Sequence, residues 1–213
     1  MRLRKKPWIT EAIKEYHEFV LTSAGSELSG HWAEQFGRQA PLHVELGTGK
    51  GRFICELAER HPEINFIGIE AQQDVLFYAA KKVRERNLTN VRLLVFDINN
   101  ILELFAPGEV TRFYINFCDP WPKARHAKRR LTHAGFLGKY RHLLQKGGQL
   151  FFKTDNRPLF DFSLEQFAEA DLKIEELTYD LHHSGVEDNI MTEYEAKFSS
   201  QGVKINRCEV IFP

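Results

Sequence analysis

The chain has 213 residues, of which 43% are hydrophobic and 27% are charged, and its 29 basic and 29 acidic residues cancel to a formal net charge of zero. These values suit one soluble α/β domain with a sizeable core. No stretch approaches the roughly 20 apolar residues of a membrane span, and the basic start "MRLRKKPW" lacks the apolar segment of a signal peptide, so we expect a cytoplasmic protein.

Hydrophobic periodicity predicts strands that alternate with helices along most of the chain. A helix is predicted over residues 11–21, in an N-terminal extension (residues 1–40) that packs on or lies beside a main domain (residues 41–213). Strands are predicted over residues 42–47, 64–70, 91–97, 110–117, 149–155, 173–181 and 204–212. Helices are predicted over residues 50–61, 73–87, 100–106, 133–147 and 158–170, and Gly147–Gly148 is expected to stop the fourth of these. The alternation indicates an α/β fold with a doubly wound, mainly parallel sheet covered on both faces, closed by an antiparallel C-terminal pair.

The glycine-rich turn "ELGTGKG" (residues 45–51) follows the first strand of the main domain and opens a helix. Glycines at such a turn let the backbone approach a ligand closely, and the helix start offers free N–H groups. Gly47, Gly49 and Gly51 give the spacing G-x-G-x-G, whereas the dinucleotide fingerprint is G-x-G-x-x-G. The acid that precedes the turn, Glu45, would repel a pyrophosphate. It suits a cationic ligand, such as one that bears a sulfonium and an amino group.

Acidic residues lie at or near the carboxyl ends of four successive strands: Glu45, Glu70, Asp97 and Asp119. In open α/β sheets the carboxyl ends of the strands line the crevice in which ligands bind. Glu70 can accept hydrogen bonds from both hydroxyls of a ribose, and Asp97 or its neighbours can meet an adenine edge. Each acid alone has a plainer explanation, because acids also favour the start of the following helix.

This pattern resembles the class I S-adenosylmethionine-dependent methyltransferases over about residues 40–212. The resemblance implies S-adenosylmethionine as the cofactor, bound at the glycine turn (Gly47, Gly49) and the strand-end acids. It also implies a Rossmann-like sheet of seven strands whose last strand is antiparallel.

Basic residues are concentrated after the strand predicted at residues 110–117. No Asp or Glu occurs from Pro120 to Thr154, and this window contains nine Lys and Arg residues, several of them in "RHAKRR" (residues 125–130). Such segregation indicates a basic surface for a polyanionic partner, with a solvated charged face as the alternative.

Three further motifs are more specific: "DPWPKARHAKRR" (residues 119–130), "KTD" (residues 153–155) and "TEYEAKF" (residues 192–198). Together with "ELGTGKG", "IGIE" and "RLRKKPW" they resemble the bacterial tRNA (guanine-N7)-methyltransferase family almost from end to end. The resemblance implies methylation of guanosine 46 in the variable loop of tRNA. Residue by residue, it implies methyl-donor contacts at Glu45, Glu70, Asp97 and Asp119, substrate contacts at Lys123, Asp155, Thr192, Glu193, Tyr194 and Glu195, and RNA contacts at Arg125, His126, Lys128, Arg129 and Arg130. The departures from the family pattern, such as Cys118 and Ala127, lie at positions where variation is expected.

Guanine N7 carries a free lone pair at neutral pH, so catalysis can be mostly positioning and electrostatics, without a His or Cys nucleophile or a metal. Asp119 is the expected catalytic residue, because a carboxylate stabilises the positive charge that the ring gains. Asp155 can accept from guanine N1–H and the 2-amino group, although the two roles can be exchanged. Trp121 can stack on a nucleotide or pack on its own loops. The carboxylates of "TEYE" can clamp the guanosine or cap a helix, and without the resemblance the capping interpretation is favoured.

Several alternatives stay open at this point. A methyltransferase that acts on an exocyclic amine has a related motif after its fourth strand, but with two adjacent prolines before the aromatic residue. A nicotinamide-dependent oxidoreductase has a different glycine spacing, and a non-catalytic RNA-binding protein would not need all four strand-end acids. Cys55, Cys118 and Cys208 are far apart and are expected to be reduced, buried thiols. The sequence leaves both a monomer and a homodimer open.

Overall fold

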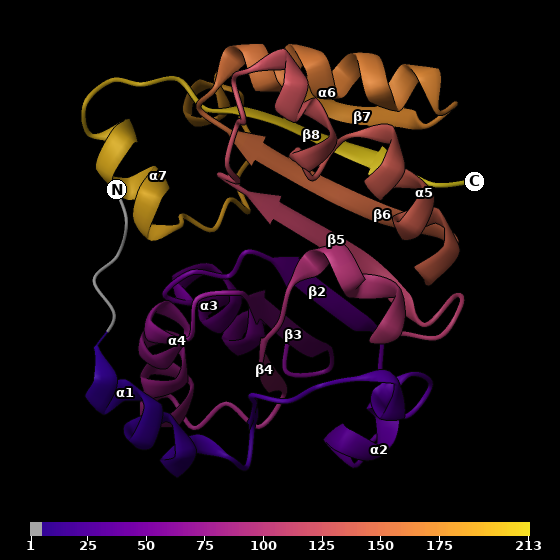
Figure 1. Cartoon of the computed structure of the whole chain (residues 1–213). Coiled ribbons are helices and arrows are strands. Elements are labelled where there is room, and N and C mark those ends of the chain that lie inside the picture. Colours follow the sequence, from indigo (N-terminus) through magenta and orange to yellow (C-terminus); the bar gives the residue numbers. More distant parts are fainter. Residues whose placement is uncertain (1–5) are drawn as a thin grey trace. The chain divides into compact units, whose positions relative to one another are not determined.

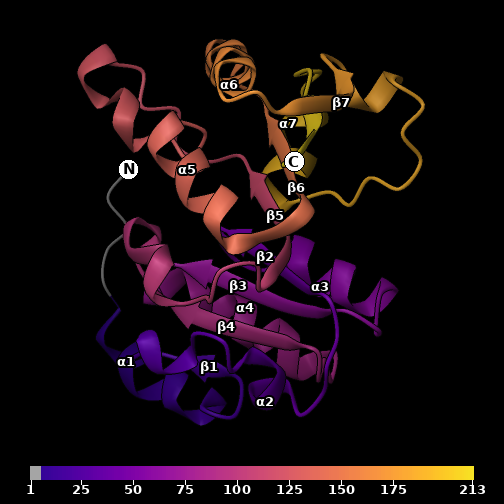
Figure 2. The ribbon, with the colours of Figure 1, turned by 90° about the vertical axis from the view of Figure 1, so that its right-hand side faces the viewer.

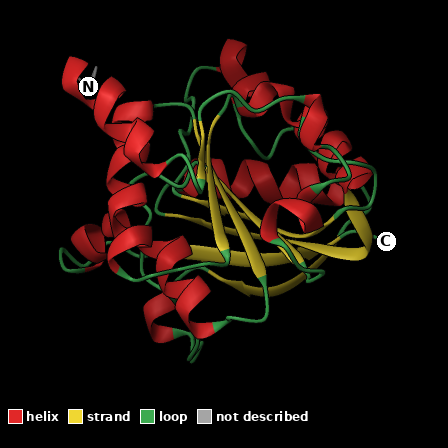
Figure 3. Ribbon diagram, turned by 90° about the horizontal axis from the view of Figure 1, so that it is seen from below, coloured by secondary structure: helices red, strands yellow, loops and turns green. Residues whose placement is uncertain are grey.

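The computed structural model describes residues 6–213, which form two compact units. The first unit ends at Leu104 and the second begins at Phe105. The loops that join the helices and strands of both units are green in Figure 3. Within residues 6–213, no helix is both long enough and apolar enough to cross a membrane. The boundary expected at residue 40, between an extension and a main domain, stays a prediction.

The first unit contains four parallel strands in the order β1-β4-β3-β2. Their bounds are β1 Val20–Leu21, β2 Leu42–Leu46, β3 Asn65–Glu70 and β4 Val91–Val95. The last three confirm the strands predicted for this part of the chain. Every residue of β2 is buried, as expected for an inner strand of a parallel sheet covered on both faces.

Helices of the first unit pack on these strands (Figures 1 and 2). They are α1 Pro7–Ala12, η1 Ile13–Tyr16, η2 Ser26–Leu28, α2 Trp32–Phe36, α3 Arg52–Arg60, α4 Gln73–Glu85 and η3 Ile98–Glu103, where η marks a 3₁₀-helix. Helices α3 and α4 contact each other and the strands β3 and β4, and α1 packs against α4. The helices predicted at residues 50–61 and 73–87 are confirmed, whereas residues 98–103 form a 3₁₀-helix instead of the α-helix expected at residues 100–106.

A helix is present in the N-terminal segment, but the bounds predicted for it, residues 11–21, are wrong. The helix begins earlier, with Pro7 in its first turn, where a fixed φ and a missing N–H are tolerated. It tightens to a 3₁₀-helix that ends at Tyr16, and Val20 and Leu21 then pair with Leu93 and Leu94 of β4. The first residues of the "MRLRKKPW" arm, 1–5, lie outside the described residues.

The second unit contains the strands β5 Val110–Asn116, β6 Leu144–Thr154, β7 Lys173–Thr178 and β8 Asn206–Ile211, in the order β5-β6-β8-β7. Strands β5 and β6 are parallel, and β8 lies antiparallel between β6 and β7. The predicted antiparallel C-terminal pair is therefore confirmed. In total the described residues contain eight strands, one more than expected, and the extra strand is β1.

The helices of the second unit are η4 Ala124–Arg129, α5 Ala134–Leu143, α6 Arg157–Glu169, η5 Leu181–His183 and α7 Glu193–Ser199. Helices α5 and α6 pack against each other (Figure 2). The helix predicted to run to Gly147 ends instead at Leu143, because Leu144 already pairs with Val110 as the first residue of β6. Gly147, with φ of +74°, lies in the irregular stretch of that strand where the register with β5 shifts.

Candidate active site

The glycine turn at the end of β2 has the conformation that its sequence predicts. The backbone N–H groups of Gly47 and Thr48 both donate to the carbonyl oxygen of Ile69, at 2.9 Å each, which holds the turn against β3. Gly47 and Gly49 have φ of +83° and +58°, and a side chain at either position would meet no atom within 4 Å. A Cβ at Gly51 would instead lie 2.6 Å from the Cβ of Ala79 in α4. The first two glycines thus face open space, and the third allows α3 and α4 to pack closely.

Two carboxylates flank this turn. Glu45 is 3% exposed and accepts a hydrogen bond of 2.5 Å from the Thr48 hydroxyl. Glu70, at the end of β3, accepts from the backbone N–H of Gly49 at 3.2 Å and from that of Gln72 at 2.9 Å. The backbone of the glycine turn therefore fixes the orientation of Glu70, and the two acids make the turn electronegative.

Asp97 follows β4 and is exposed. Its carboxylate caps the 3₁₀-helix η3, accepting from the backbone N–H of Asn99 at 2.9 Å and from the Asn99 side chain at 2.8 Å. The plainer explanation for an acid after a strand, a helix cap, thus holds for Asp97. The capping does not use every lone pair of the carboxylate.

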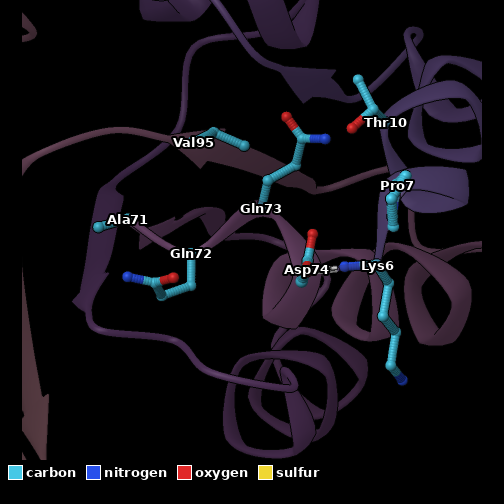
Figure 4. A pocket seen from close by; sticks show the side chains of 8 residues that line it. All are labelled: Lys6, Pro7, Thr10, Ala71, Gln72, Gln73, Asp74 and Val95. Carbon is cyan, nitrogen blue, oxygen red and sulfur yellow. Dashed lines mark hydrogen bonds between the residues drawn. The ribbon is translucent and has the colours of Figure 1, made fainter. Parts of the chain in front are cut away.

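A cavity of about 510 Å³ opens beside these strand ends (Figure 4). Its lining includes Ala71 and Gln72, which follow Glu70, and Val95, which ends β4. Helix α1 contributes Pro7 and Thr10 to the lining, and the Lys6 backbone N–H donates to the carboxylate of Asp74 at 2.8 Å. The N-terminal helix thus forms one wall of a hollow next to the acids predicted to hold a nucleoside.

In the second unit, Asp119 is exposed in the loop that follows β5. The backbone N–H of Phe117 donates to the carbonyl oxygen of Lys153 at 2.9 Å, so the start of this loop is held by β6. Phe117 and Trp121 have φ of +54° and +41°, conformations that are strained for bulky side chains. Burial raises the pKa of the Cys118 thiol to about 12, and the charge of Asp119 adds to this effect.

The basic run after this loop divides into two groups. Lys123, Arg125 and Lys128 are exposed. Arg129 is also exposed, but its guanidinium lies over the Trp121 ring, 4.9 Å from the ring centroid, and the half-buried His126 ring meets the same indole edge-on at 5.8 Å. Arg130 is half-buried and donates to the backbone carbonyls of Pro120 and Trp121.

Helix α7 carries the "TEYE" motif and begins as a capped helix. The Thr192 hydroxyl accepts from the backbone N–H of Glu195 at 2.9 Å, so the cap of this helix is the threonine of the motif and not one of its carboxylates, for which a capping role was expected. Tyr194 is 43% exposed, stacks on Phe198 with ring centroids 4.2 Å apart, and lies 5.1 Å from the ring of Phe117. Its hydroxyl lies 3.5 Å from the Asp155 carboxylate, and burial together with that charge raises the pKa of Tyr194. The structure therefore brings the end of β5, the end of β6 and α7 together.

A buried ion pair fixes α7 to β6. The ammonium group of Lys153 donates to the carboxylate of Glu195 at 2.8 Å, to the Ile190 carbonyl at 2.8 Å and to the Asn189 side chain at 3.0 Å. The two charged side chains are 5% and 0% exposed. Asn189 also donates to the second oxygen of Glu195 at 2.6 Å. Sequence reasoning named Lys153 only as part of "KTD" and missed this pair, because 42 residues separate its members.

Other titratable groups have local partners. His183 hydrogen-bonds Asp180, and hydrogen bonds from His183 and Lys204 lower the pKa of Asp180. His182 lies 3.4 Å from Glu195. Within residues 6–213, no cluster of His, Cys, Asp or Glu has the arrangement of a metal site, and the three cysteines form no disulfide.

Comparison with known proteins assigns the family. A model described as a putative methyltransferase matches residues 39–208. A tRNA (guanine-N(7)-)-methyltransferase of Halalkalibacterium halodurans is 49% identical over 212 residues, which cover 100% of this chain and 96% of the relative. The protein of the same name from Bacillus subtilis is 47% identical over 99% of this chain and 98% of its own length. The chain belongs to the tRNA (guanine-N(7)-)-methyltransferase family.

Solved structures agree at the level of the fold. The 16S rRNA methyltransferase KamB superposes with a TM-score of 0.67 over 92% of this chain and 99% of its own, at 15% identity. An antibiotic-related methyltransferase superposes with a TM-score of 0.64 over 90% of this chain and 94% of its own, at 16% identity. These matches confirm the predicted methyltransferase fold, and the family assignment confirms the resemblance stated from the motifs.

Proposed function

We propose that the protein transfers the methyl group of S-adenosylmethionine to N7 of guanosine 46 in the variable loop of tRNA. The observation that carries this proposal is the identity of 47–49% with proteins named tRNA (guanine-N(7)-)-methyltransferase, over almost the whole length of both chains. The exposed cations of the second unit give a polyanion a surface to bind. The position within tRNA comes from the motif resemblance alone.

The residues of the first unit fit the proposed cofactor. Glu70 has the chemistry to accept hydrogen bonds from the two ribose hydroxyls, and the amides of Gly49 and Gln72 hold it in place. Glu45 adds a buried negative charge that favours a cationic ligand, and the open space at Gly47 and Gly49 lets such a ligand approach the backbone. Asp97 has acceptor capacity left for an adenine edge. When bound, S-adenosylmethionine supplies an electrophilic methyl group on a sulfonium centre.

The second unit fits a guanosine substrate. N7 has a free lone pair, so no protein group has to remove a proton before the methyl group is transferred. We propose that Asp119 stabilises the positive charge that develops on the ring, and that Asp155 accepts from N1–H and the 2-amino group. Tyr194, exposed beside Asp155 and backed by Phe198, offers a ring on which the base can stack. Lys123 and the exposed members of the basic run would then meet phosphates, with Thr192 and Glu195 supporting the helix that presents Glu193 and Tyr194.

The decisive test is methylation of unmodified tRNA with labelled S-adenosylmethionine, followed by borohydride reduction and aniline scission. The proposal predicts one labile site, at position 46, and no incorporation into a transcript with adenosine at that position. Incorporation without a labile site would mean an exocyclic amine acceptor, and scission elsewhere would overturn the assigned position. The Asp119→Ala variant should lose methylation while it still retains tRNA, and normal turnover by that variant would remove Asp119 from the mechanism.

The remaining proposals concern the setting of the enzyme. A tRNA substrate implies a cytoplasmic protein, because tRNA is modified there. The sequence leaves both a monomer and a homodimer open, and light scattering coupled to gel filtration distinguishes them: given a chain of 24.8 kDa, a particle of about 25 kDa is a monomer and one of about 50 kDa a homodimer.

A further inference from the structure

The loop "DPWP" (residues 119–122) has too few backbone N–H donors to fix its conformation by hydrogen bonds within the loop. Pro120 and Pro122 have no N–H, so Asp119 and Trp121 supply the only backbone donors of these four residues. Trp121 also has φ of +41°, a region that bulky residues adopt only when the surroundings impose it. The conformation of the loop that carries Asp119 therefore has to be fixed from outside.

Arg130 supplies these outside contacts. Its Nε donates to the Pro120 carbonyl and its Nη2 donates to the Trp121 carbonyl, both at 3.1 Å. These two carbonyls lie on either side of the strained Trp121. The guanidinium also lies 4.3 Å from the centroid of the Phe162 ring in α6, which anchors it to the unit's framework. A planar fork with two adjacent N–H donors matches two successive carbonyls, and a lysine ammonium cannot reproduce that geometry.

Arg125 and Lys128 differ from Arg130 in the exposure of their side chains and in forming no hydrogen bond with the loop. Both side chains are exposed, and within residues 6–213 neither forms a hydrogen bond or an ion pair. Their charges are therefore available to phosphates, whereas the charge of Arg130 is half-buried and its donors are used by the loop.

We propose that Arg130 is a positioning residue that holds the Pro120–Trp121 backbone, and through it Asp119, while Arg125 and Lys128 bind the tRNA backbone. This inference rests on the proposed function for its catalytic consequence. Its structural part, the attachment of the loop, does not depend on the reaction.

The test compares Arg130→Lys with the matched double variant Arg125→Ala/Lys128→Ala. The affinity for unmodified tRNA is measured between about 50 and 200 mM salt, and kcat is measured at saturating tRNA and S-adenosylmethionine. The slope of log K against log salt is negative, and each lost phosphate contact reduces its magnitude by about 0.7–0.9. The double variant should therefore lose about 1.4–1.8 from the slope. Arg130→Lys should keep the wild-type slope and lose about 10- to 100-fold in kcat, because misplacement of a catalytic group has costs of that order. A slope reduced by about one in Arg130→Lys, or an unchanged kcat, would overturn the proposal.

Hydrogen–deuterium exchange of a peptide that covers residues 117–123 provides a readout that needs no catalysis. It should accelerate in Arg130→Lys and stay at the wild-type rate in the double variant. Unchanged exchange in Arg130→Lys would refute the attachment even if the protein proved inactive on tRNA. If exchange accelerated but wild-type protein did not methylate tRNA, the proposed function would fail and the attachment would stand. Arg130→Lys keeps the charge and most of the side-chain length, and a thermal melt confirms that the variant tested is folded.

Discussion

Substitution of Glu195 by glutamine removes a buried negative charge and keeps the shape of the side chain. In the native protein the Lys153 ammonium has three donors and three acceptors around it, from Glu195, Asn189 and the Ile190 carbonyl. With both side chains of the pair at most 5% exposed, water cannot replace the lost carboxylate. Removal of one partner from a buried pair costs about 3–5 kcal/mol, because the other charge stays buried without compensation.

The predicted loss is large enough to measure in two ways. Urea unfolding at pH 7 should show a free energy of unfolding lower by about 3–5 kcal/mol than that of the wild type. In a chain of this size each kcal/mol lowers Tm by about 2–4 °C, so the midpoint should fall by about 6–20 °C. His182→Asn is the matched control, since its exposed side chain contacts the same carboxylate at 3.4 Å and should cost less than about 1 kcal/mol.

A second variant separates the charge from the packing. Lys153→Met/Glu195→Gln removes both charges but keeps an acceptor for Asn189, so it should be more stable than Glu195→Gln alone. The reasoning is refuted if the free energy of unfolding of Glu195→Gln lies within about 0.5 kcal/mol of the wild-type value. It is also refuted if the double variant loses as much stability as Lys153→Met and Glu195→Gln lose together.

Three smaller predictions follow from other contacts. Thr192→Ala should lower the free energy of unfolding by about 1 kcal/mol, measured in urea, because the first turn of α7 loses its cap. Thr192→Ser keeps the hydroxyl and should retain most of the stability that the cap contributes. Glu70→Ala should weaken S-adenosylmethionine binding by about 10-fold or more in calorimetry, whereas the exposed Glu63→Ala should not, and equal affinities would remove Glu70 from the cofactor site. At pH 8 the Cys118 thiol, with its pKa raised to about 12, should react with iodoacetamide about 1,000-fold more slowly than in the urea-unfolded chain; a fast native reaction would contradict the burial.

The central strands and the strand-end acids could be predicted from the sequence because both depend on short-range patterns. Short segments rich in apolar residues identify β2 and β3, and chain order then places their carboxyl ends at one edge of a parallel sheet. The two-residue strand β1 has no such pattern and exists through its pairing with β4. The end of α5 was mispredicted for the same reason: the glycines gave a local stop signal, but pairing of Leu144 with Val110 ends the helix earlier.

Side-chain roles within the motifs were less accessible to sequence reasoning. "RHAKRR" reads as six neighbouring positions of one surface, yet the fold turns Arg130 toward the loop and leaves Arg125 exposed. Likewise "TEYE" reads as one group of contacts, whereas Thr192 caps the helix and Glu195 is buried against a residue from another strand. Which member of a motif faces solvent depends on long-range packing, which no local pattern encodes.

The short length of α7 makes this division of roles important for activity. A helix of seven residues is not stable by itself in water, so its position depends on its attachments. In this protein the attachments are the Thr192 cap, the Lys153–Glu195 pair and the stacking of Tyr194 on Phe198. Loss of Lys153 should therefore lower activity without removing any contact to tRNA, since it frees the helix that presents Tyr194 beside Asp155. A loss of activity in a "TEYE" or "KTD" variant thus identifies a substrate contact only when the free energy of unfolding is unchanged.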